Sequence, residues 1–482
     1  MQIWRFDTIT AVATEPFLYR NVSGKIAGLI DDGVLRPGER VPSVRRLGAQ
    51  EGVSVSTVLQ AYTLLESRGY IEARPQSGFY VRSRRESLPP EPRTSAPGRP
   101  ATRVGVSALV SKMLQGIMDP QVVPFGAACP APELLPGAKV NRMLAGLIRR
   151  SGREINSYNF PPGLYDLRRQ VARRSLDWGG RLGPEDIVVT SGATEALHLC
   201  LRAVARPGDL VAIESPAYFG TLLLLESLGM EVIEVPSHPR HGMCLDLLAG
   251  ALRKHRIRAC IASPNFSNPL GSSMPDQNKR ELVAMLARRE IPLIEDDLYG
   301  DLYFGAARPR AAKAFDRDGL VLLCSSFSKM IAPAYRVGWT AAGRFQAKVE
   351  ALKLTTTLAT PTLLQAAIAA FLESGAYDRH LRKMRAAVAT QAEQMIAAIG
   401  EHFPPGTKVT RPEGGFVVWV ELPHDVDSLE LQERALAERI NISPGPIFSA
   451  RQRYRNFIRL NCGYPWSERL DQGLRTLGRL AR

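Results

Sequence analysis

A proline-rich segment constrains the fold of this 482-residue chain more than any other feature. Residues 84–103, RRESLPPEPRTSAPGRPATR, contain five prolines among Ser, Gly and Arg residues, a composition that builds no hydrophobic core. It favours an extended, semi-rigid connection with a reach on the order of 60 Å over roughly 20 residues. Because the chain also exceeds what one core usually holds, we expect an N-terminal module over residues 1–82, a linker over 83–104 and a larger body over 105–482.

The bulk composition narrows the functional classes without assigning one. The net charge of +15 suits a polyanionic partner, yet residues 1–90 hold only 12 Lys and Arg against 9 Asp and Glu, so charge alone locates no DNA site. The six cysteines form no CxxC pair and no His cluster has ligand spacing, which predicts free thiols in a reducing cytoplasm and no metal site. The apolar runs are too short to span a bilayer and the N-terminus lacks the layout of a signal peptide, so we expect a cytoplasmic protein without a membrane partner.

The N-terminal module has the pattern of a winged helix-turn-helix. Apolar residues recur at helical spacing over 18–30, and Ser43 is placed to cap a helix that ends near residue 51. Ser54 then caps a second helix, and residues 70–82 alternate as a hairpin does. Helix, turn, helix and hairpin in this order predict a module that inserts its second helix into a DNA groove.

Short hydroxyls and basic side chains of this module are suited to phosphates and base edges. We expect DNA contacts from Ser43, Arg45, Arg46, Ser54, Ser56, Thr57, Arg74 and Gln76. A small helical module for protein–protein interaction is the alternative. The string LRPGERVPSVRRLGAQEGVSVSTVLQAYTLLESRGYI closely resembles the DNA-binding domain of GntR-family transcription regulators, and this resemblance implies that the second helix and the wing bind DNA.

The body alternates short β-branched runs with helical stretches. Runs such as LVAIES, ACIASPN, IPLIEDD and LVLLCSS are candidate strands, and ATEALHLCLRAVA and NKRELVAMLARRE are candidate helices. This alternation predicts an α/β fold with a largely parallel sheet. After about residue 350 helices dominate, and GGFVVWVEL and NFIRLNCGY then predict a smaller α+β unit.

Lys329 lies in the stretch SSFSKMIAPAYRVGW, directly after a candidate buried strand. A lysine at the end of a buried strand loses solvation, and its amine then becomes nucleophilic enough to form a Schiff base. An ordinary solvated surface lysine is the alternative. The first interpretation requires a carbonyl partner, and pyridoxal 5'-phosphate is the cofactor that uses such a lysine.

Each further need of this cofactor has a candidate near the end of a strand, where α/β sheets bind ligands. The amides of Ala193 and Thr194 open a helix and suit a phosphate, Tyr218 can stack on the ring, and Asp296 can hold the pyridine nitrogen protonated. Asn268 and Tyr299 are placed for the phenolic oxygen, and Ser326, Ser328 and Arg336 for the phosphate end. We expect Lys329, Asp296 and Tyr218 to take part in the chemistry. Taken singly, a strand-end Asp is more often a cap and a Tyr more often part of the core.

Residues from about 120 to 465 resemble class I aminotransferases of fold type I, a pyridoxal-phosphate-dependent transferase fold with a large and a small domain, and most of all the aminoadipate and kynurenine branch. The resemblance implies that Tyr158 in SYNFPPG crosses to the phosphate of a partner subunit. It also implies that Arg459 in NFIRL receives a substrate carboxylate, with Asn268 beside it. A structural ion pair is the alternative for Arg459. The sequence departs from the family at Leu270, where the family often has Thr.

The two halves together resemble the MocR subfamily of GntR regulators. This resemblance implies a head-to-tail homodimer that binds an operator and senses pyridoxal phosphate, an amino acid or an amine through aldimine chemistry. The rival hypothesis is an active aminotransferase, converting an amino acid to a 2-oxo acid, that carries a DNA-binding domain. A structural nucleoid protein would leave the cofactor residues unexplained.

Overall fold

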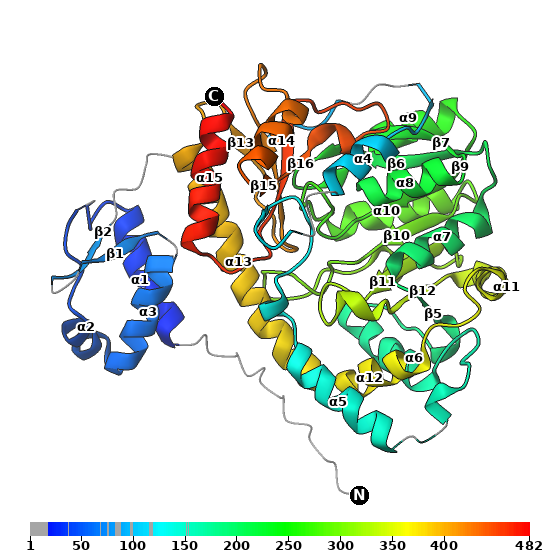
Figure 1. The fold of residues 1–482 in the computed structure, drawn as a ribbon, viewed down its shortest axis with the longest axis horizontal. Coiled ribbons are helices and arrows are strands. Elements are labelled where there is room, and N and C mark those ends of the chain that lie inside the picture. The colour runs from blue at the N-terminus through cyan, green and yellow to red at the C-terminus, as the bar shows by residue number, and fades with distance from the viewer. Residues whose placement is uncertain are drawn as a thin grey trace, which may run out of the picture. The chain divides into compact units, whose positions relative to one another are not determined.

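The computed structural model separates the chain into two compact units, Met1–Leu88 and Pro89–Arg482, which are described one at a time (Figure 1). The residues that the structure describes are 18–36, 38–67, 69–74, 77–81, 88–96, 100–114, 119–150, 152 and 154–482.

The first unit has the predicted order of helices and strands. Its elements are α1 (Leu18–Asp31), α2 (Val44–Glu51), α3 (Val55–Ser67), β1 (Ile71–Arg74) and β2 (Gly78–Val81), and the two strands pair antiparallel. Ser43 caps α2 as expected, because its side chain accepts a hydrogen bond from the backbone N–H of Arg46. Gly52 ends α2 at a φ of 63°, a conformation that favours glycine. The core of this unit includes Val22, Tyr62 and Leu65, all buried.

The second unit is built on a mixed sheet of nine strands. The strand order is β3 (Thr102–Arg103), β7 (Glu231–His238), β6 (Leu210–Ser215), β9 (Ile257–Ala262), β10 (Leu293–Asp296), β11 (Val321–Ser326), β12 (Gly338–Ala341) and β5 (Val188–Thr190), with β8 (Gly242–Met243) pairing beside β7. Strands β7, β6, β9, β10 and β11 run parallel, whereas β12 is antiparallel to both of its neighbours. The largely parallel sheet is thus confirmed.

The central strands are buried along most of their length because helices cover both faces of the sheet. Val211 and Ile213 pack with α7 (Ala193–Val204), whereas Ala212 between them packs with α9 (Leu245–Lys254) and α10 (Asp276–Ala287). Further helices and strands of this unit are α4 (Ser107–Leu114), β4 (Val123–Pro124), α5 (Gly137–Arg150), α6 (Tyr165–Arg174) and α8 (Phe219–Ser227).

The smaller α+β part follows in the chain, as predicted. Its elements are α11 (Gln346–Thr356), α12 (Thr362–Glu373), α13 (Ala376–His402), β13 (Lys408–Val409), β14 (Val417–Glu421), α14 (Ser428–Ala437), β15 (Ile440–Asn441), β16 (Ser443–Pro444), β17 (Phe457–Asn461) and α15 (Glu468–Leu480). Strands β13, β14, β17 and β16 form an antiparallel sheet. In the part of the chain that the structure describes, no helix is long and apolar enough to cross a membrane.

The C-terminal part of the expected linker lies on the body. We call residues 89–96 and 100–103 the strap. The compact second unit begins at Pro89, before the boundary expected at residue 105. The body begins earlier than expected because the strap forms hydrogen bonds with it. Prolines do not prevent a segment from pairing through its carbonyls and through the N–H groups of its other residues. Strand β3, at the end of the strap, completes the sheet against β7.

Two side chains fix the middle of the strap. The carboxylate of Glu91 accepts hydrogen bonds from Nε of Arg240 at 2.6 Å and from the backbone N–H of Arg411 at 3.3 Å. Ser95 Oγ donates to the carbonyl of Ser215 at 2.5 Å. The strap therefore holds the turn after β7, the segment after β13 and the end of β6 together.

Candidate functional site

The predicted cofactor residues gather at one edge of the large sheet. Parallel strands end at the same edge, and β5 runs in the direction of β11 because two antiparallel pairings separate them. The segments that follow β5, β6, β9, β10 and β11 carry the phosphate-binding, stacking, amide, carboxylate and lysine candidates in this order. This edge is where α/β sheets bind ligands.

The N-terminus of α7 and Arg336 lie side by side and together could hold an anion. The first turn of a helix leaves its N–H groups unpaired, and Ala193 and Thr194 open α7. Arg336 donates through Nη2 to the carbonyl of Ser191 and through Nη1 to Ser328 Oγ, both at 3.3 Å. Gly192 has a φ of 90°, and a Cβ there would lie 2.4 Å from Arg336 Nη2. Glycine is therefore required for the arginine to approach the helix.

Lys329 follows β11 and reaches the segment that contains Ala128 and Cys129. Its Nζ donates to the carbonyl of Ala128 at 2.7 Å and to Cys129 Sγ at 3.3 Å. The side chain is half-buried, so the lysine is neither a freely solvated surface charge nor fully enclosed. Ser326 Oγ accepts from the backbone N–H of Ser328 at 3.3 Å and shapes the bend before the lysine.

The carboxylate at the end of β10 fits the pyridine nitrogen of pyridoxal phosphate. Asp296 Oδ1 is buried and has no hydrogen-bond partner among the described residues, as Asn268 Oδ1 also has none. An orphaned buried carboxylate oxygen is costly unless a donor arrives, and a protonated ring nitrogen is such a donor. Burial, and next the charge of Asp297, raise the pKa of Asp296 to about 7. The site therefore fits the cofactor on its own geometry.

Two tyrosines next to this carboxylate stay protonated. Burial raises the pKa of Tyr218 to about 12 and the pKa of Tyr299 further above its ordinary value. A neutral phenol at residue 299 can donate to the phenolic oxygen of the cofactor. Electrostatic interactions link Tyr218 and Tyr299 to Asp296 and Arg459, so these side chains share one site.

Arg459 presents free donors inside the protein. Its exposed fraction is 0 %, its Nη2 donates to Ser443 Oγ at 2.6 Å and to the carbonyl of Gly126, and its Nε and Nη1 have no partner among the described residues. Burial lowers the pKa of this guanidinium from its ordinary value. The groups that interact with it electrostatically are the phenols and thiols of Tyr299, Tyr218, Cys129 and Cys462. A ligand carboxylate could accept hydrogen bonds from Nε and Nη1 of Arg459.

Three features were not visible in the sequence or differ from its pattern. The segment from Gly126 to Cys129 bridges Arg459 and Lys329 through its carbonyls, a long-range contact without a local signal. Leu270, where the family often has Thr, is 4 % exposed and packs in the core under the sheet. Tyr158 is 73 % exposed and stacks on Phe160 with ring centroids 5.7 Å apart.

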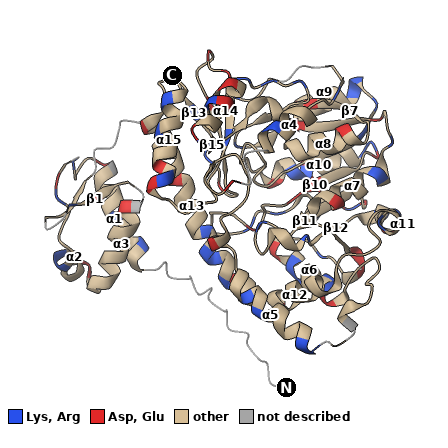
Figure 2. Ribbon diagram, viewed as in Figure 1, with Lys and Arg blue, Asp and Glu red and all other residues tan. Residues whose placement is uncertain are grey.

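The first unit presents the predicted DNA-binding residues on its surface. Arg45 and Arg46 are exposed on α2, which Figure 2 shows as basic. Ser54 Oγ lies 2.8 Å from the hydroxyls of both Ser56 and Thr57, so these three form one cluster at the start of α3.

Two other wing and helix positions complete this surface. Arg74 is exposed, pairs with Glu72 at 2.9 Å and lies over the Tyr80 ring, while Gln76 lies outside the described residues. Sequence reasoning missed Val55, which opens α3 and is 48 % exposed. An exposed apolar residue at the start of a groove-binding helix suits the methyl group of thymine.

Each of the two units matches a known protein family. Residues 18–81 match the bacterial regulatory proteins of the gntR family, and residues 134–477 match aminotransferase class I and II. An uncharacterized HTH-type transcriptional regulator of Escherichia coli K12, YdcR, is 40 % identical over 96 % of this chain and 98 % of its own length. The chain is a MocR-type member of the GntR family. A second relative from the same strain, YjiR, is 38 % identical over 95 % of this chain and 98 % of its own length.

Solved structures resemble the body of this MocR-type regulator. LysN, the α-aminoadipate aminotransferase of Thermus thermophilus, complexed with N-(5'-phosphopyridoxyl)-L-leucine, is 30 % identical with a TM-score of 0.70 over 78 % of this chain and 98 % of its own. The kynurenine aminotransferase of Pyrococcus horikoshii is 26 % identical with a TM-score of 0.73 over 79 % of this chain and 95 % of its own. The regulator therefore has a fold-type-I body that binds pyridoxal phosphate, together with a DNA-binding unit.

Proposed function

We propose that this MocR-type regulator changes its binding to DNA when an α-amino acid occupies the cofactor site between Lys329 and Arg459. The observation that carries the proposal is the buried guanidinium of Arg459, which keeps Nε and Nη1 unpartnered among the described residues. A planar guanidinium matches a carboxylate with two parallel donors, and a buried charge without a counter-ion favours a ligand that supplies one. The effector class is therefore an amino acid and not a simple amine.

Each residue of the site has a role in holding the cofactor and the effector. When bound, pyridoxal phosphate supplies an aldehyde for amines and an electron-withdrawing ring. Lys329 holds the aldehyde end, and Asp296 keeps a proton on the pyridine nitrogen. Tyr299 donates to the phenolic oxygen, and Arg336 neutralises the phosphate at the start of α7. The amine of an effector would compete with the amine of Lys329 for that aldehyde end.

The DNA-binding unit requires a second copy for a two-part operator. We infer a head-to-tail homodimer, supported by the exposed and stacked Tyr158 and Phe160. In this dimer Tyr158 contributes to the partner's phosphate site. Each copy places α3 and its wing on one half-site. Because its partner is chromosomal DNA, we place the regulator in the cytoplasm.

The test measures DNA binding of the full chain loaded with pyridoxal phosphate. A DNA probe is first selected from random sequence with the protein, and its affinity is then measured by fluorescence anisotropy with each of the common L-amino acids and with their decarboxylated amines. We expect at least one amino acid to change the affinity and its matched amine to leave it unchanged. Equal responses to an amino acid and its amine would refute carboxylate recognition.

A working aminotransferase is the second candidate. Lys329, Asp296 and Tyr299 lie at the edge of the large sheet, and Arg459, on β17 of the smaller sheet, interacts electrostatically with Tyr299. Among its relatives, the 2-aminoadipate transaminase of Thermus thermophilus is 31 % identical over 79 % of this chain and 95 % of its own length. The same amino acids are incubated with 2-oxoglutarate, and formation of the matching 2-oxo acid is followed. Turnover without any effect on DNA binding would favour the enzyme over the regulator.

A further inference from the structure

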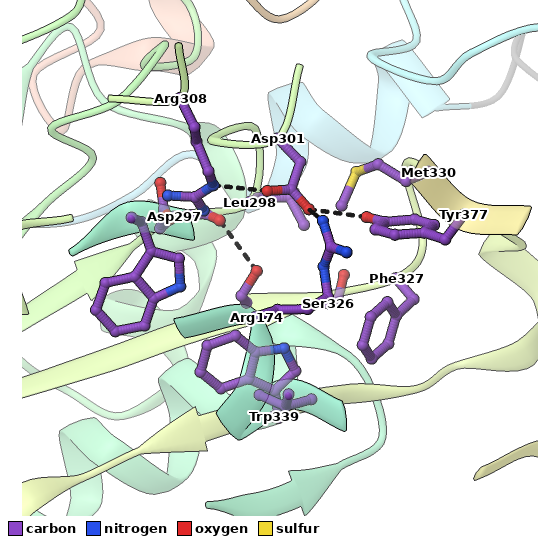
Figure 3. Close-up of a pocket in the computed structure, with 13 residues that line it drawn as sticks. Arg174, Asp297, Leu298, Asp301, Arg308, Ser326, Phe327, Met330, Trp339 and Tyr377 are labelled. Atoms are coloured by element: carbon purple, nitrogen blue, oxygen red, sulfur yellow. Dashed lines mark hydrogen bonds and ion pairs between the residues drawn. The ribbon is translucent and has the colours of Figure 1, made fainter. Parts of the chain in front are cut away.

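Figure 3 shows a buried cluster of charges around a pocket whose lining includes Asp297 and Met330, the residues that follow Asp296 and Lys329 in the chain. Its members come from the end of α6, the start of α13 and the segment after β10, and they are Arg174, Asp297, Asp301, Arg308 and Tyr377. Neither the predicted cofactor residues nor the DNA-binding residues include any of them. The roles assigned so far therefore leave these five residues unexplained.

Arg308 stands at the centre of the cluster and bonds to two carboxylates. Its Nη2 donates to Asp297 Oδ2 and its Nε donates to Asp301 Oδ1, each at 2.6 Å. Asn265 Nδ2 donates to the other oxygen of Asp297 at 2.9 Å. The backbone leaves room for this pair, because a Cβ at Gly300 would lie 2.5 Å from Asp297 Oδ1 and 2.6 Å from Arg308 Nη2.

The surroundings of the cluster are apolar and tight. Trp178, Trp339 and Phe327 line it, and the cavity beside it measures about 30 Å³. Such a volume holds about one water molecule. The charges are therefore compensated by one another and by nearby charged side chains: Asp177 and Asp378 pair with Arg174, and Lys279 acts on Asp297. In a medium of this kind, an uncompensated carboxylate acts strongly on its neighbours.

The neighbour that matters is Asp296, the residue before Asp297. Its carboxylate faces few charges on the described chain, and those it interacts with are the carboxylates of Asp297 and Glu214, the amine of Lys329, the phenols of Tyr218 and Tyr299 and the thiol of Cys324. Two acids flank Asp296 in sequence: the Glu295 carboxylate accepts hydrogen bonds from the backbone N–H groups of Ala312 and Lys313, whereas the charge of Asp297 acts on Asp296. Arg308 is not among these groups, so any effect that it has on Asp296 passes through Asp297.

We propose that Arg308 is a positioning residue for the cofactor, which neutralises Asp297 so that Asp296 can remain a carboxylate beside the pyridine nitrogen. This inference rests on the proposed binding of pyridoxal phosphate at Asp296. It adds a residue, twelve positions along the chain, that sets the charge of the cofactor-binding carboxylate without touching the cofactor.

The direction of the effect follows from like-charge repulsion. A free charge on Asp297 raises the pKa of Asp296, in addition to the rise that burial causes. A carboxylate contributes to cofactor binding above its pKa, and the contribution is lost as the pH falls through that pKa. Removing Arg308 therefore moves the loss of cofactor affinity to higher pH, and removing the charge of Asp297 moves it to lower pH.

The test measures the dissociation constant of pyridoxal phosphate for the full chain from pH 5 to pH 9, by the change in protein fluorescence. Four proteins are compared: the wild type, Arg308→Gln, Asp297→Asn and the double variant. We expect the pH at which cofactor affinity is half lost on the acid side to increase by roughly one unit in Arg308→Gln and to decrease by roughly one unit in Asp297→Asn. Because the effect of Arg308 passes through Asp297, the double variant should show the same acid limb of the affinity profile as Asp297→Asn.

A purely structural role for Arg308 predicts a different outcome. Both single variants would then weaken the cofactor equally at every pH, and the double variant would be no better than either, which would overturn the proposal. Arg308→Gln breaks a buried ion pair and lowers stability, so the direction of the pH shift is decided by Asp297→Asn. Arg308→Lys, which keeps the positive charge, should show the same acid limb of the affinity profile as the wild type. If borohydride reduction of the wild type attached no cofactor to Lys329, the proposed function would fail instead, and this outcome is distinct from a flat pH profile.

Discussion

Replacing Arg459 by methionine separates ligand recognition from folding. The guanidinium is fully buried, and the hydrogen bonds it donates end on Ser443 Oγ and on the carbonyl of Gly126. These two groups also bond to each other, with Ser443 Oγ donating to Gly126 at 2.7 Å. Both therefore keep a partner when the arginine is gone. The variant removes a buried cation that has no carboxylate beside it among the described residues, and methionine fills most of the space.

The magnitude of the binding loss follows from the pair that the arginine would form. Truncating one partner of a buried, hydrogen-bonded charge pair costs about 2–5 kcal/mol. At about 1.4 kcal/mol per factor of ten, the affinity for an α-amino acid should fall by about 30-fold to 4,000-fold. The attachment of pyridoxal phosphate to Lys329 should be unchanged. The melting temperature without ligand should stay within a few degrees of the wild type or rise, because an unpaired buried charge is unfavourable.

The assay combines an absorbance titration with amino acids and a thermal melt of the same preparation. Arg455→Met is a matched control, because this arginine lies four residues earlier, is 61 % exposed and pairs with Asp427. It should leave the titration unchanged. A large drop in melting temperature together with a normal amino-acid titration would show that Arg459 is structural and would refute the reasoning.

Three further predictions concern the cofactor and DNA. Lys329→Ala should lose the covalent attachment of pyridoxal phosphate, and peptide mapping after borohydride reduction of the wild type should find the label on Lys329 and no other lysine. Gly192→Ala should weaken cofactor binding by at least tenfold, because the added Cβ meets Arg336 at a φ of 90°, and the dissociation constant measured by fluorescence checks it. Replacing Arg45 or Arg46 by alanine should reduce the slope of log K against log salt by about 0.9 for each phosphate that the side chain neutralises. An unchanged slope in both variants would remove α2 from the DNA interface.

The fold was predictable from the sequence where the signal is local. Ser43 and Gly52 mark the ends of α2 through capping preferences that act within a few residues. LVAIES coincides with β6 because a parallel strand buried on both faces carries a continuous apolar run, here Leu210 to Ile213. Arg308 could not be found in this way. Its partners Asp297 and Asp301 lie 7 to 11 residues away with no periodic relation, and only the folded loop brings them together.

Within the site, too, features with a local sequence signal could be predicted and long-range contacts could not. Lys329, Asp296 and Tyr218 were identified because each follows a strand, and topology brings strand ends together. The bridge from Gly126 to Cys129 and the strap depend on contacts more than 100 residues apart in sequence. The composition of the strap predicts an extended segment. It does not reveal the partners of the strap, which lie on β6, β7 and the segments after β7 and β13.

The position of the strap defines where this protein can be cut and joined. An isolated body that starts at residue 105 would lack β3 and would leave the edge of β7 open at Val232, and an unpaired edge strand invites aggregation. A body that starts at Pro89 keeps that edge covered and keeps Glu91 and Ser95 in place. In the same way, a chimaera that exchanges DNA-binding units between regulators should be joined before Pro89, so that each body retains its own strap.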